Sequence, residues 1–211
     1  MGLKKYLLIG IALLLTSCSS EVASNEMETI TDNITIPEVE FIESGANTFE
    51  IEYGHQNMDR GNYDFISLRG KQKTVVEKTK EFKRGDVIYF NFPEDYNQLA
   101  NRPDDYLGRV VGLPGETVEI IDGQVFIDNQ KLDAFYARAT YLGWDLDKYR
   151  ENGFNKNTLT EEEFKEDMAP IKIKDTEVFV LSDDWIRAVG SQDFGPIEIV
   201  EIKGKVLGYK K

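Results

Sequence analysis

Cysteine and histidine are almost absent from this chain of 211 residues, which has one of each, Cys18 and His55. A single cysteine excludes an intramolecular disulfide, and without a second histidine a transition-metal site is not expected. Basic residues are also few, since 25 Lys and Arg stand against 38 Asp and Glu, for a net charge of −13. Such a surface repels nucleic acid and anionic head groups. We therefore expect no nucleic-acid partner, no metal and no cofactor.

Residues 1–17 have the pattern of a bacterial lipoprotein signal peptide. Lys4 and Lys5 precede an apolar run, Leu7–Leu15, that is too short to span a bilayer comfortably. The run ends in a lipobox whose cysteine is Cys18, and lipid chains on this residue give stable membrane anchoring. We expect a lipid anchor on the extracytoplasmic side of a bacterial envelope, at the outer membrane or the outer face of the cytoplasmic membrane. The alternative is an ordinary secretory signal with a chance cysteine.

The rest of the chain predicts a tether followed by one domain. Residues 18–37 are rich in Ser, Glu, Asn and Thr and have few large apolar residues, which is typical of a lipidated tether that does not fold. Residues 38–211 are long enough for one domain with a proper core. Within that domain, residues 133–170 are charged and aromatic and lack strand alternation, so they predict a partly helical insertion. A capping-box pattern at 160–163 predicts a short helix there.

Alternating or dense apolar runs predict strands in the remaining parts of this domain. The clearest feature is a hairpin in which Asp122-Gly123 separates two alternating runs, a pattern that favours a type I′ turn. The expected fold is mainly β, with antiparallel sheets and a partly helical insertion. The runs lie at 49–53, 63–66, 87–90, 117–121, 124–127, 177–181, 197–200 and 205–207.

Three sequence blocks carry a family resemblance, and a fourth supports it more weakly. They are KRGDVIYF at 83–90 with Pro93, RVVGLPGE at 109–116, SDDWIRAVGSQDFG at 182–195 and, more weakly, QNMD at 56–59. In order and spacing these blocks resemble the type I signal peptidase family over roughly residues 55–207. The resemblance implies a signal-peptidase-like β domain and a serine–lysine endopeptidase that cuts signal peptides at the outer face of the cytoplasmic membrane.

The two reactive positions of that family are altered here. The family serine precedes a methionine, which is Met58, and the residue at the serine position is Asn57. The family lysine precedes an arginine, which is Arg109, and the residue at the lysine position is Gly108. An amide is not a useful nucleophile, glycine offers no base, and a guanidinium does not deprotonate in proteins. The resemblance therefore implies a scaffold without an intact catalytic pair.

Supporting positions of the third block also differ from the family pattern. The family residues are replaced at Ala188, Gly190 and Gln192 and kept at Asp183, Ser191, Phe194 and Gly195. We expect an inactive pseudopeptidase that binds an extended peptide segment or a protein partner, with main-chain hydrogen bonds in the cleft giving affinity. The candidate cleft residues are Gln56, Asn57, Met58, Arg109, Asp183 and Ser191.

Two other functions stay open at this point. The first is an active serine endopeptidase for signal peptide processing with a non-standard nucleophile, Ser67 or Ser44. Its base would be Lys71, Lys73 or Lys83. The lone His55 stands beside the site but not at the lysine position, and a lone histidine is usually a surface or hydrogen-bonded residue. The second is a structural envelope lipoprotein whose charged insertion at 133–170 is its working surface.

Overall fold

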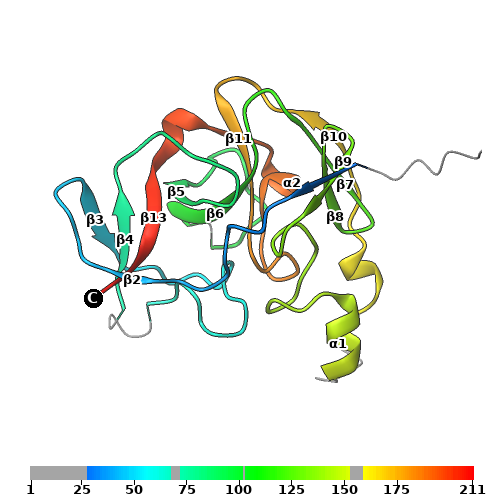
Figure 1. Cartoon of the computed structure of the whole chain (residues 1–211), viewed down its shortest axis with the longest axis horizontal. Helices are drawn as coiled ribbons and strands as arrows, with labels where there is room; N and C mark the ends of the chain where they lie inside the picture. The colour runs from blue at the N-terminus through cyan, green and yellow to red at the C-terminus, as the bar shows by residue number, and fades with distance from the viewer. Residues whose placement is uncertain (1–27, 68–71, 102, 153–158) are drawn as a thin grey trace, which may run out of the picture.

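The computed structural model describes residues 28–67, 72–101, 103–152 and 159–211, and it is built mostly of strands (Figure 1). The prediction of a mainly β fold is confirmed. No helix in these ranges is long and apolar enough to cross a membrane. The predicted signal peptide and Cys18 lie outside the described residues. The helical elements are α1 (Leu146–Asn152), α2 (Ser191–Phe194) and the 3-10 turns at Glu162–Phe164 and Ile199–Glu201.

The larger sheet has eight strands in the order β12-β11-β6-β5-β13-β4-β3, with β2 also paired to β13. All its pairs are antiparallel except β2 with β13. The sheet encloses a first core, which includes Phe90, Leu107, Val110 and Val180. Its strands are β2 (Phe41–Ile42), β3 (Thr48–Ile51), β4 (Thr74–Glu77), β5 (Val87–Asn91), β6 (Asp105–Gly112), β11 (Glu177–Leu181), β12 (Ile197–Glu198) and β13 (Ile202–Lys210).

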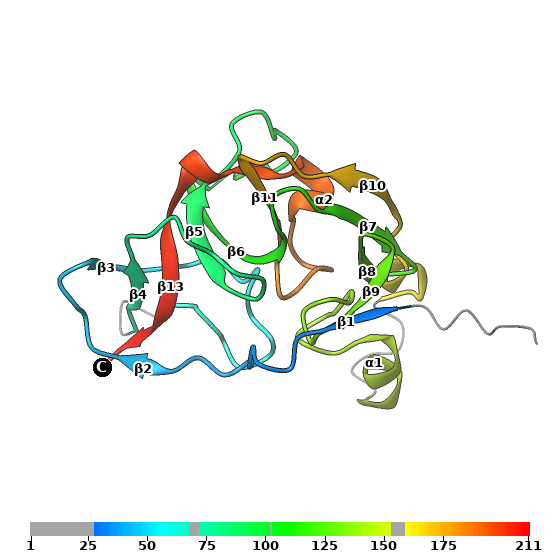
Figure 2. The ribbon, with the colours of Figure 1, turned by 45° about the horizontal axis from the view of Figure 1, so that its top comes forward.

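The smaller sheet has five strands in the order β1-β9-β8-β7-β10 and lies beside the larger one, to the right in Figure 2. It packs on a second core that includes Val111, Val118, Phe179 and Trp185. Asp122 and Gly123 join β7 to β8 with φ angles of 51° and 70°, so the predicted tight hairpin is confirmed. The strands are β1 (Thr29–Thr31), β7 (Thr117–Ile121), β8 (Gln124–Ile127), β9 (Gln130–Asp133) and β10 (Met168–Lys172).

Strand β6 lies between the two cores, and from Gly108 to Val111 its side-chain directions alternate between them. Val110 belongs to the first core, and a side chain at Gly108 would point at Phe90 and Val180 of the same core. Val111 belongs to the second core, and the Arg109 guanidinium lies over the ring of Tyr136. The alternation of this one strand therefore separates Gly108 from Arg109.

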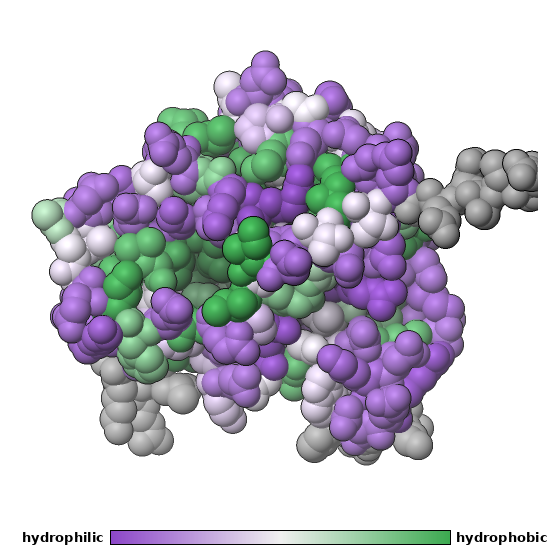
Figure 3. All heavy atoms as spheres, in the orientation of Figure 1, coloured by the Kyte–Doolittle hydropathy of each residue, from purple (hydrophilic) through white to green (hydrophobic). Residues whose placement is uncertain are grey.

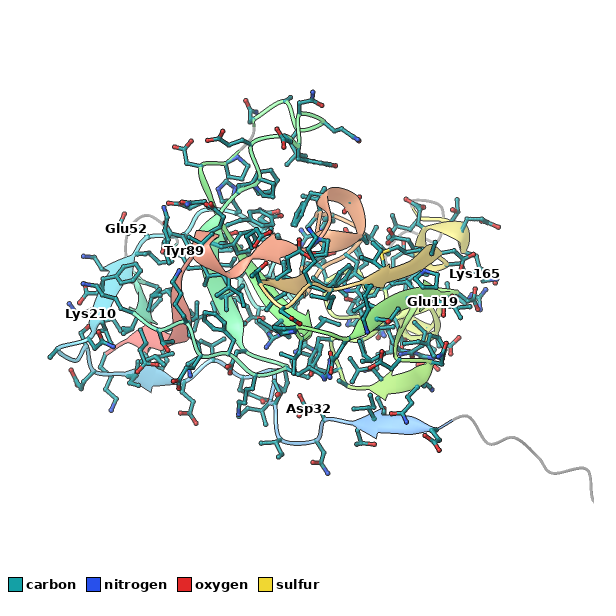
Figure 4. All side chains as sticks on the ribbon, turned by 90° about the horizontal axis from the view of Figure 1, so that it is seen from above. Asp32, Glu52, Tyr89, Glu119, Lys165 and Lys210 are labelled. Carbon is teal, nitrogen blue, oxygen red and sulfur yellow. The ribbon has the colours of Figure 1, made fainter. Side chains whose placement is uncertain are left out.

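The prediction that residues 18–37 form an unstructured tether is wrong for its last part. Thr29–Thr31 form β1, which pairs in parallel with β9, and the chain then crosses to β2 along the lower side of both sheets in Figure 2. Asp32, labelled in Figure 4, accepts hydrogen bonds from Thr35 and from the Tyr136 hydroxyl. The prediction weighed only apolar burial, whereas this segment is held by main-chain pairing and a polar turn.

Three local predictions also need correction. The run at 63–66 is not a strand, because Tyr63 and Phe65 have φ angles of 60° and 61°, and Asp59 accepts from the Tyr63 N–H. The run at 197–200 is a strand only at Ile197–Glu198 and then turns as a 3-10 helix. The predicted helix at 160–163 is a single 3-10 turn at Glu162–Phe164.

The segment 133–170 contributes to the core as well as to the surface. Tyr136, Ala137 and Ala139 are buried in the second core, and Met168 pairs with Ile120 of β7. Helix α1 projects from the body of the domain with most of its charged side chains exposed (Figure 1). The boundaries of an insertion at 133–170 stay a prediction.

Candidate active site

Asn57 lies in the segment after β3, where its amide joins three parts of the chain. Its Nδ2 donates to the Leu107 carbonyl at 2.7 Å and to Ser182 Oγ at 3.2 Å, and its Oδ1 accepts from the Tyr53 hydroxyl at 2.6 Å. The side chain is 3% exposed. Burial of an amide is tolerated when its hydrogen bonds are made, as they are here. Asn57 therefore holds the segment against β6, directly beside Gly108.

Gly108 is buried in β6 opposite Ile88 of β5. A Cβ at this position would lie 3.1 Å from Val180 Cβ and 3.2 Å from Phe90 Cε1. These approaches are tighter than ordinary van der Waals contact, so a longer side chain requires its neighbours to move. The place where the family has its lysine is thus filled by the first core.

Arg109 and Asp183 form a buried ion pair on the other side of β6. Arg109 Nε donates to Asp183 Oδ1 at 2.7 Å, and its Nη2 donates to Asp183 Oδ2. The third donor, Nη1, reaches the Gly85 carbonyl at 2.8 Å, and the guanidinium lies 4.9 Å from the Phe135 ring centroid. The pair is bidentate and the guanidinium also bonds the main chain, which helps to offset the cost of burying a charged pair.

Most of the predicted cleft residues are buried in the fold. Met58 is 0% exposed in the first core, and Ser191, also 0% exposed, accepts the Val180 N–H at the start of α2. Gln56 is exposed, and its Oε1 accepts from Arg187 Nη1 at 3.2 Å. The structure brings Asn57 and Gly108 together and places Arg109 and Asp183 on the far side of β6, so the six residues do not line one open groove.

A second ionic group near Asn57 was missed by sequence reasoning. Arg187 Nε donates to Asp184 Oδ2 at 2.6 Å, and Nη2 reaches Asp59 Oδ2 at 3.5 Å. Asp184 is fully buried and also accepts the Leu142 N–H. Burial raises the pKa of Asp184, and the Arg187 guanidinium opposes that rise. The Asp-Asp pair followed three residues later by arginine was the signal that could have indicated this group.

The candidate serine nucleophiles are engaged elsewhere. Ser67 Oγ donates to the Gln72 carbonyl and accepts the Tyr53 N–H, and Ser44 Oγ donates to Glu50 at 2.9 Å. Lys73 pairs with the same Glu50. Lys71 lies outside the described residues. Across the ranges that the structure describes, no hydrogen bond joins a serine hydroxyl to a lysine amine.

His55 lies at the surface, with its ring packed against those of Tyr53 and Tyr106 at centroid distances of 5.2 and 6.1 Å. Partial burial lowers the pKa of its imidazole. No group of three or more metal-ligating side chains occurs in the described part of the chain.

The main chain around His55 offers unpaired donors. Neither Gly54, His55 nor Gln56 donates its N–H to another residue that the structure describes. The side chains of His55 and Gln56 are exposed. A stretch outside the sheets whose N–H groups bond no described residue offers donors with which a further strand could pair.

The fold and this site define a β domain of the signal peptidase type. The family model described as "Signal peptidase, peptidase S26" matches residues 48–208, and the chain belongs to this family. The resemblance inferred from the four blocks is confirmed.

Similar proteins are signal peptidases. Signal peptidase I S of Bacillus subtilis (strain 168) is 26% identical over 137 residues, which cover 63% of each chain. Signal peptidase I of Rickettsia typhi is 32% identical over 97 residues, 46% of this chain and 33% of that one. A signal peptidase I crystal structure from Enterococcus faecalis V583 aligns with a TM-score of 0.42 and 22% identity, over 59% of this chain and 96% of the other. The match thus spans about three fifths of the Bacillus subtilis relative.

Proposed function

We propose that this chain is a signal peptidase family member that has lost catalysis and binds an extended peptide segment or a protein partner. The observation that carries the proposal is the state of the two reactive positions. Asn57 is a buried, fully hydrogen-bonded amide, and Gly108 is enclosed by Phe90 and Val180. Peptide hydrolysis by this family's chemistry needs an activated hydroxyl and a neutral amine at these places, and neither is supplied.

The N–H groups at 54–56, which bond no described residue, support the proposal that the chain binds a peptide. A peptide lying beside them would gain main-chain hydrogen bonds, while the exposed ring of His55, which packs on buried Tyr106, offers a surface for its side chains. Tyr53 and Asn57 already bond the N–H and carbonyl of Leu107, so β6 is not the strand that the peptide would meet there.

The test uses the full chain purified in detergent and a fluorescent peptide with a signal-type sequence. We expect saturable binding by anisotropy and no cleavage product by mass spectrometry. His55→Pro removes one N–H and should weaken binding about tenfold, whereas His55→Ala keeps that N–H and serves as the matched control. Absence of saturable binding would overturn the binding proposal. Cleavage would favour the active endopeptidase with a non-standard nucleophile.

We also propose that Cys18 carries the lipid that holds the protein in the bacterial envelope. The lipobox and the position of the sole cysteine support this. Expression in a bacterial host with labelled fatty acid should label the wild-type chain and leave Cys18→Ser unlabelled. Equal labelling of both chains, or of neither, would contradict lipidation at this residue.

A further inference from the structure

A hollow of about 570 Å³ lies where three separate segments of the chain meet beside Tyr209 of β13. Its walls come from Pro37–Val39 of the segment before β2, from the loop at 60–64, and from the turn and first residues of α1 at 142–148. We call it the Arg60 pocket. It contains none of the residues at 54–56, so it is separate from the proposed peptide edge.

The guanidinium of Arg60 forms no side-chain hydrogen bond or ion pair within the described ranges. It lies over the Phe135 ring, 4.2 Å from the centroid. Burial and the neighbouring Arg109 charge lower the pKa of Arg60, while the carboxylates of Asp183, Asp64 and Glu38 oppose this shift. A partly desolvated guanidinium whose N–H groups lack acceptors favours the binding of an anion.

The backbone of Arg60 is held in place by the turn at Leu142-Gly143. Gly143 has a φ angle of 75°, and a Cβ there would lie 3.1 Å from the Arg60 carbonyl oxygen. Gly61 in turn approaches the Leu142 carbonyl, where a Cβ would lie at 3.3 Å. The two glycines allow this close packing, so Arg60 is positioned before any ligand arrives.

Lys148 places a second cation on the rim of the pocket. It is exposed on α1, and its amine has no hydrogen bond or ion pair with another described residue. Glu38 and Asp64 also line the hollow, and the Asp64 carboxylate accepts the main-chain N–H of Arg60 at 3.4 Å. The two carboxylates repel a multiply charged anion. The two cations can still attract a ligand that carries a single negative charge.

The remaining lining consists of polar Asn62, of Gly143, and of five apolar or aromatic residues, Pro37, Val39, Leu142, Trp144 and Tyr209. A ligand that matches this lining has one planar carboxylate, which suits the paired N–H groups of a guanidinium, next to an apolar side chain. We propose that the Arg60 pocket binds the free C-terminal carboxylate of a peptide whose last residue is apolar. The segment 133–170 thereby supplies one wall of a binding site.

The experiment measures binding of two probes to the full chain in detergent by calorimetry. The probes are acetyl-Ala-Leu with a free carboxylate and the same dipeptide as its C-terminal amide. We expect the acid to bind about tenfold more tightly than the amide. Arg60→Gln should abolish this preference, and Lys148→Gln, on an exposed helix, should weaken acid binding about threefold. Lys78→Gln is the matched control, because it removes one exposed, unpaired lysine charge outside the pocket and should change nothing.

Four outcomes would overturn the proposal. They are equal affinity for acid and amide, a preference that survives Arg60→Gln, inorganic phosphate binding as tightly as the acid, and no binding of either probe up to about 10 mM. Thermal melting of each variant checks that the domain is folded, and Lys148→Gln keeps the proposal testable where Arg60→Gln does not fold. If the Arg60 pocket does not bind the probes, the proposal of peptide binding at 54–56 still stands, because the two sites share no residue.

Discussion

The two faces of β6 differ in what they retain of the family's pattern. Toward the first core, Gly108 carries no side chain and the adjacent Asn57 is a neutral amide. Toward the second core, Arg109 keeps its charge and pairs with buried Asp183. The lysine position that the family resemblance assigns to one face holds a glycine, and the face one residue away has a buried ion pair.

Physical chemistry explains why these faces can change independently. A buried lysine amine that acts as a base must be kept neutral, which opposes its ordinary preference for the charged form and costs stability. Its replacement by glycine removes that cost. Removal of either partner of Arg109–Asp183 leaves a buried charge alone, which is strongly destabilising. A catalytic lysine can therefore be replaced without loss of stability, while the Arg109–Asp183 pair remains necessary for folding.

Breaking the ionic face should have the largest effect. Asp183→Ala leaves the Arg109 guanidinium buried without its carboxylate, and we expect a loss of about 3–5 kcal/mol in the free energy of unfolding, measured by urea denaturation. The control is the double variant Arg109→Met with Asp183→Leu, which should recover much of this loss. A cost below about 1 kcal/mol for Asp183→Ala would mean that the pair is not needed.

Restoring a serine and a lysine at positions 57 and 108 tests the comparison on the face of β6 that points to the first core. Asn57→Ser with Gly108→Lys should give weak cleavage of a signal-type peptide at best, since Ala188 and Gly190 leave the lysine poorly supported and its Cβ would crowd Val180 and Phe90. Gly108→Ala isolates this crowding and should cost about 1–3 kcal/mol. Strong cleavage by the double variant, or no cost for Gly108→Ala, would contradict the packing argument.

Truncating the amide should have a smaller effect than breaking the ion pair. Asn57→Ala leaves the Leu107 carbonyl without its side-chain donor, and we expect a loss of about 1–2 kcal/mol in the free energy of unfolding. Asn91→Ala is the matched control, because that exposed amide bonds only Glu201 among described side chains and should cost less than about 0.5 kcal/mol. Equal costs for the two variants would show that Asn57 does not hold its segment to β6.

The smallest expected effect concerns the polar turn after β1. Burial raises the pKa of the Asp32 carboxyl, but hydrogen bonds from Thr35, Tyr136 and Ile34 outweigh it and lower this pKa to about 2. The stabilisation is present above the ordinary value of 3.8 and is lost as the pH falls toward about 2. Asp32→Asn should therefore cost under about 1 kcal/mol at pH 6, and the difference from wild type should vanish near pH 2. The test is the melting temperature of wild type and Asp32→Asn measured from pH 6 to pH 2. A difference between the two proteins that grows on acidification would contradict a stabilising role of the ionised Asp32 carboxylate.

Local patterns predicted the parts of the fold that local forces determine. The hairpin of β7 and β8 and the bounds of β11 follow from alternation and from turn chemistry at Asp122-Gly123. Strand β1 could not be predicted in this way, because its hydrogen bonds come from β9, about a hundred residues away.

The candidate site was predictable only in part, for a related reason. The positions of Asn57 and Gly108 followed from motif spacing, and the structure places them side by side. Their burial also depends on Tyr53 and Val180, which lie outside the motif blocks. The Arg60 pocket combines segments that are distant in the sequence, and no periodicity could have assembled it.

Strand β1 also sets how far the protein reaches. It begins at Thr29, eleven residues after Cys18 (29 − 18 = 11), and a fully extended chain of that length spans at most about 40 Å. For a protein attached through that cysteine, β1 stays within this distance of the bilayer surface. Any partner that binds this domain would then meet it in the layer next to the bilayer surface.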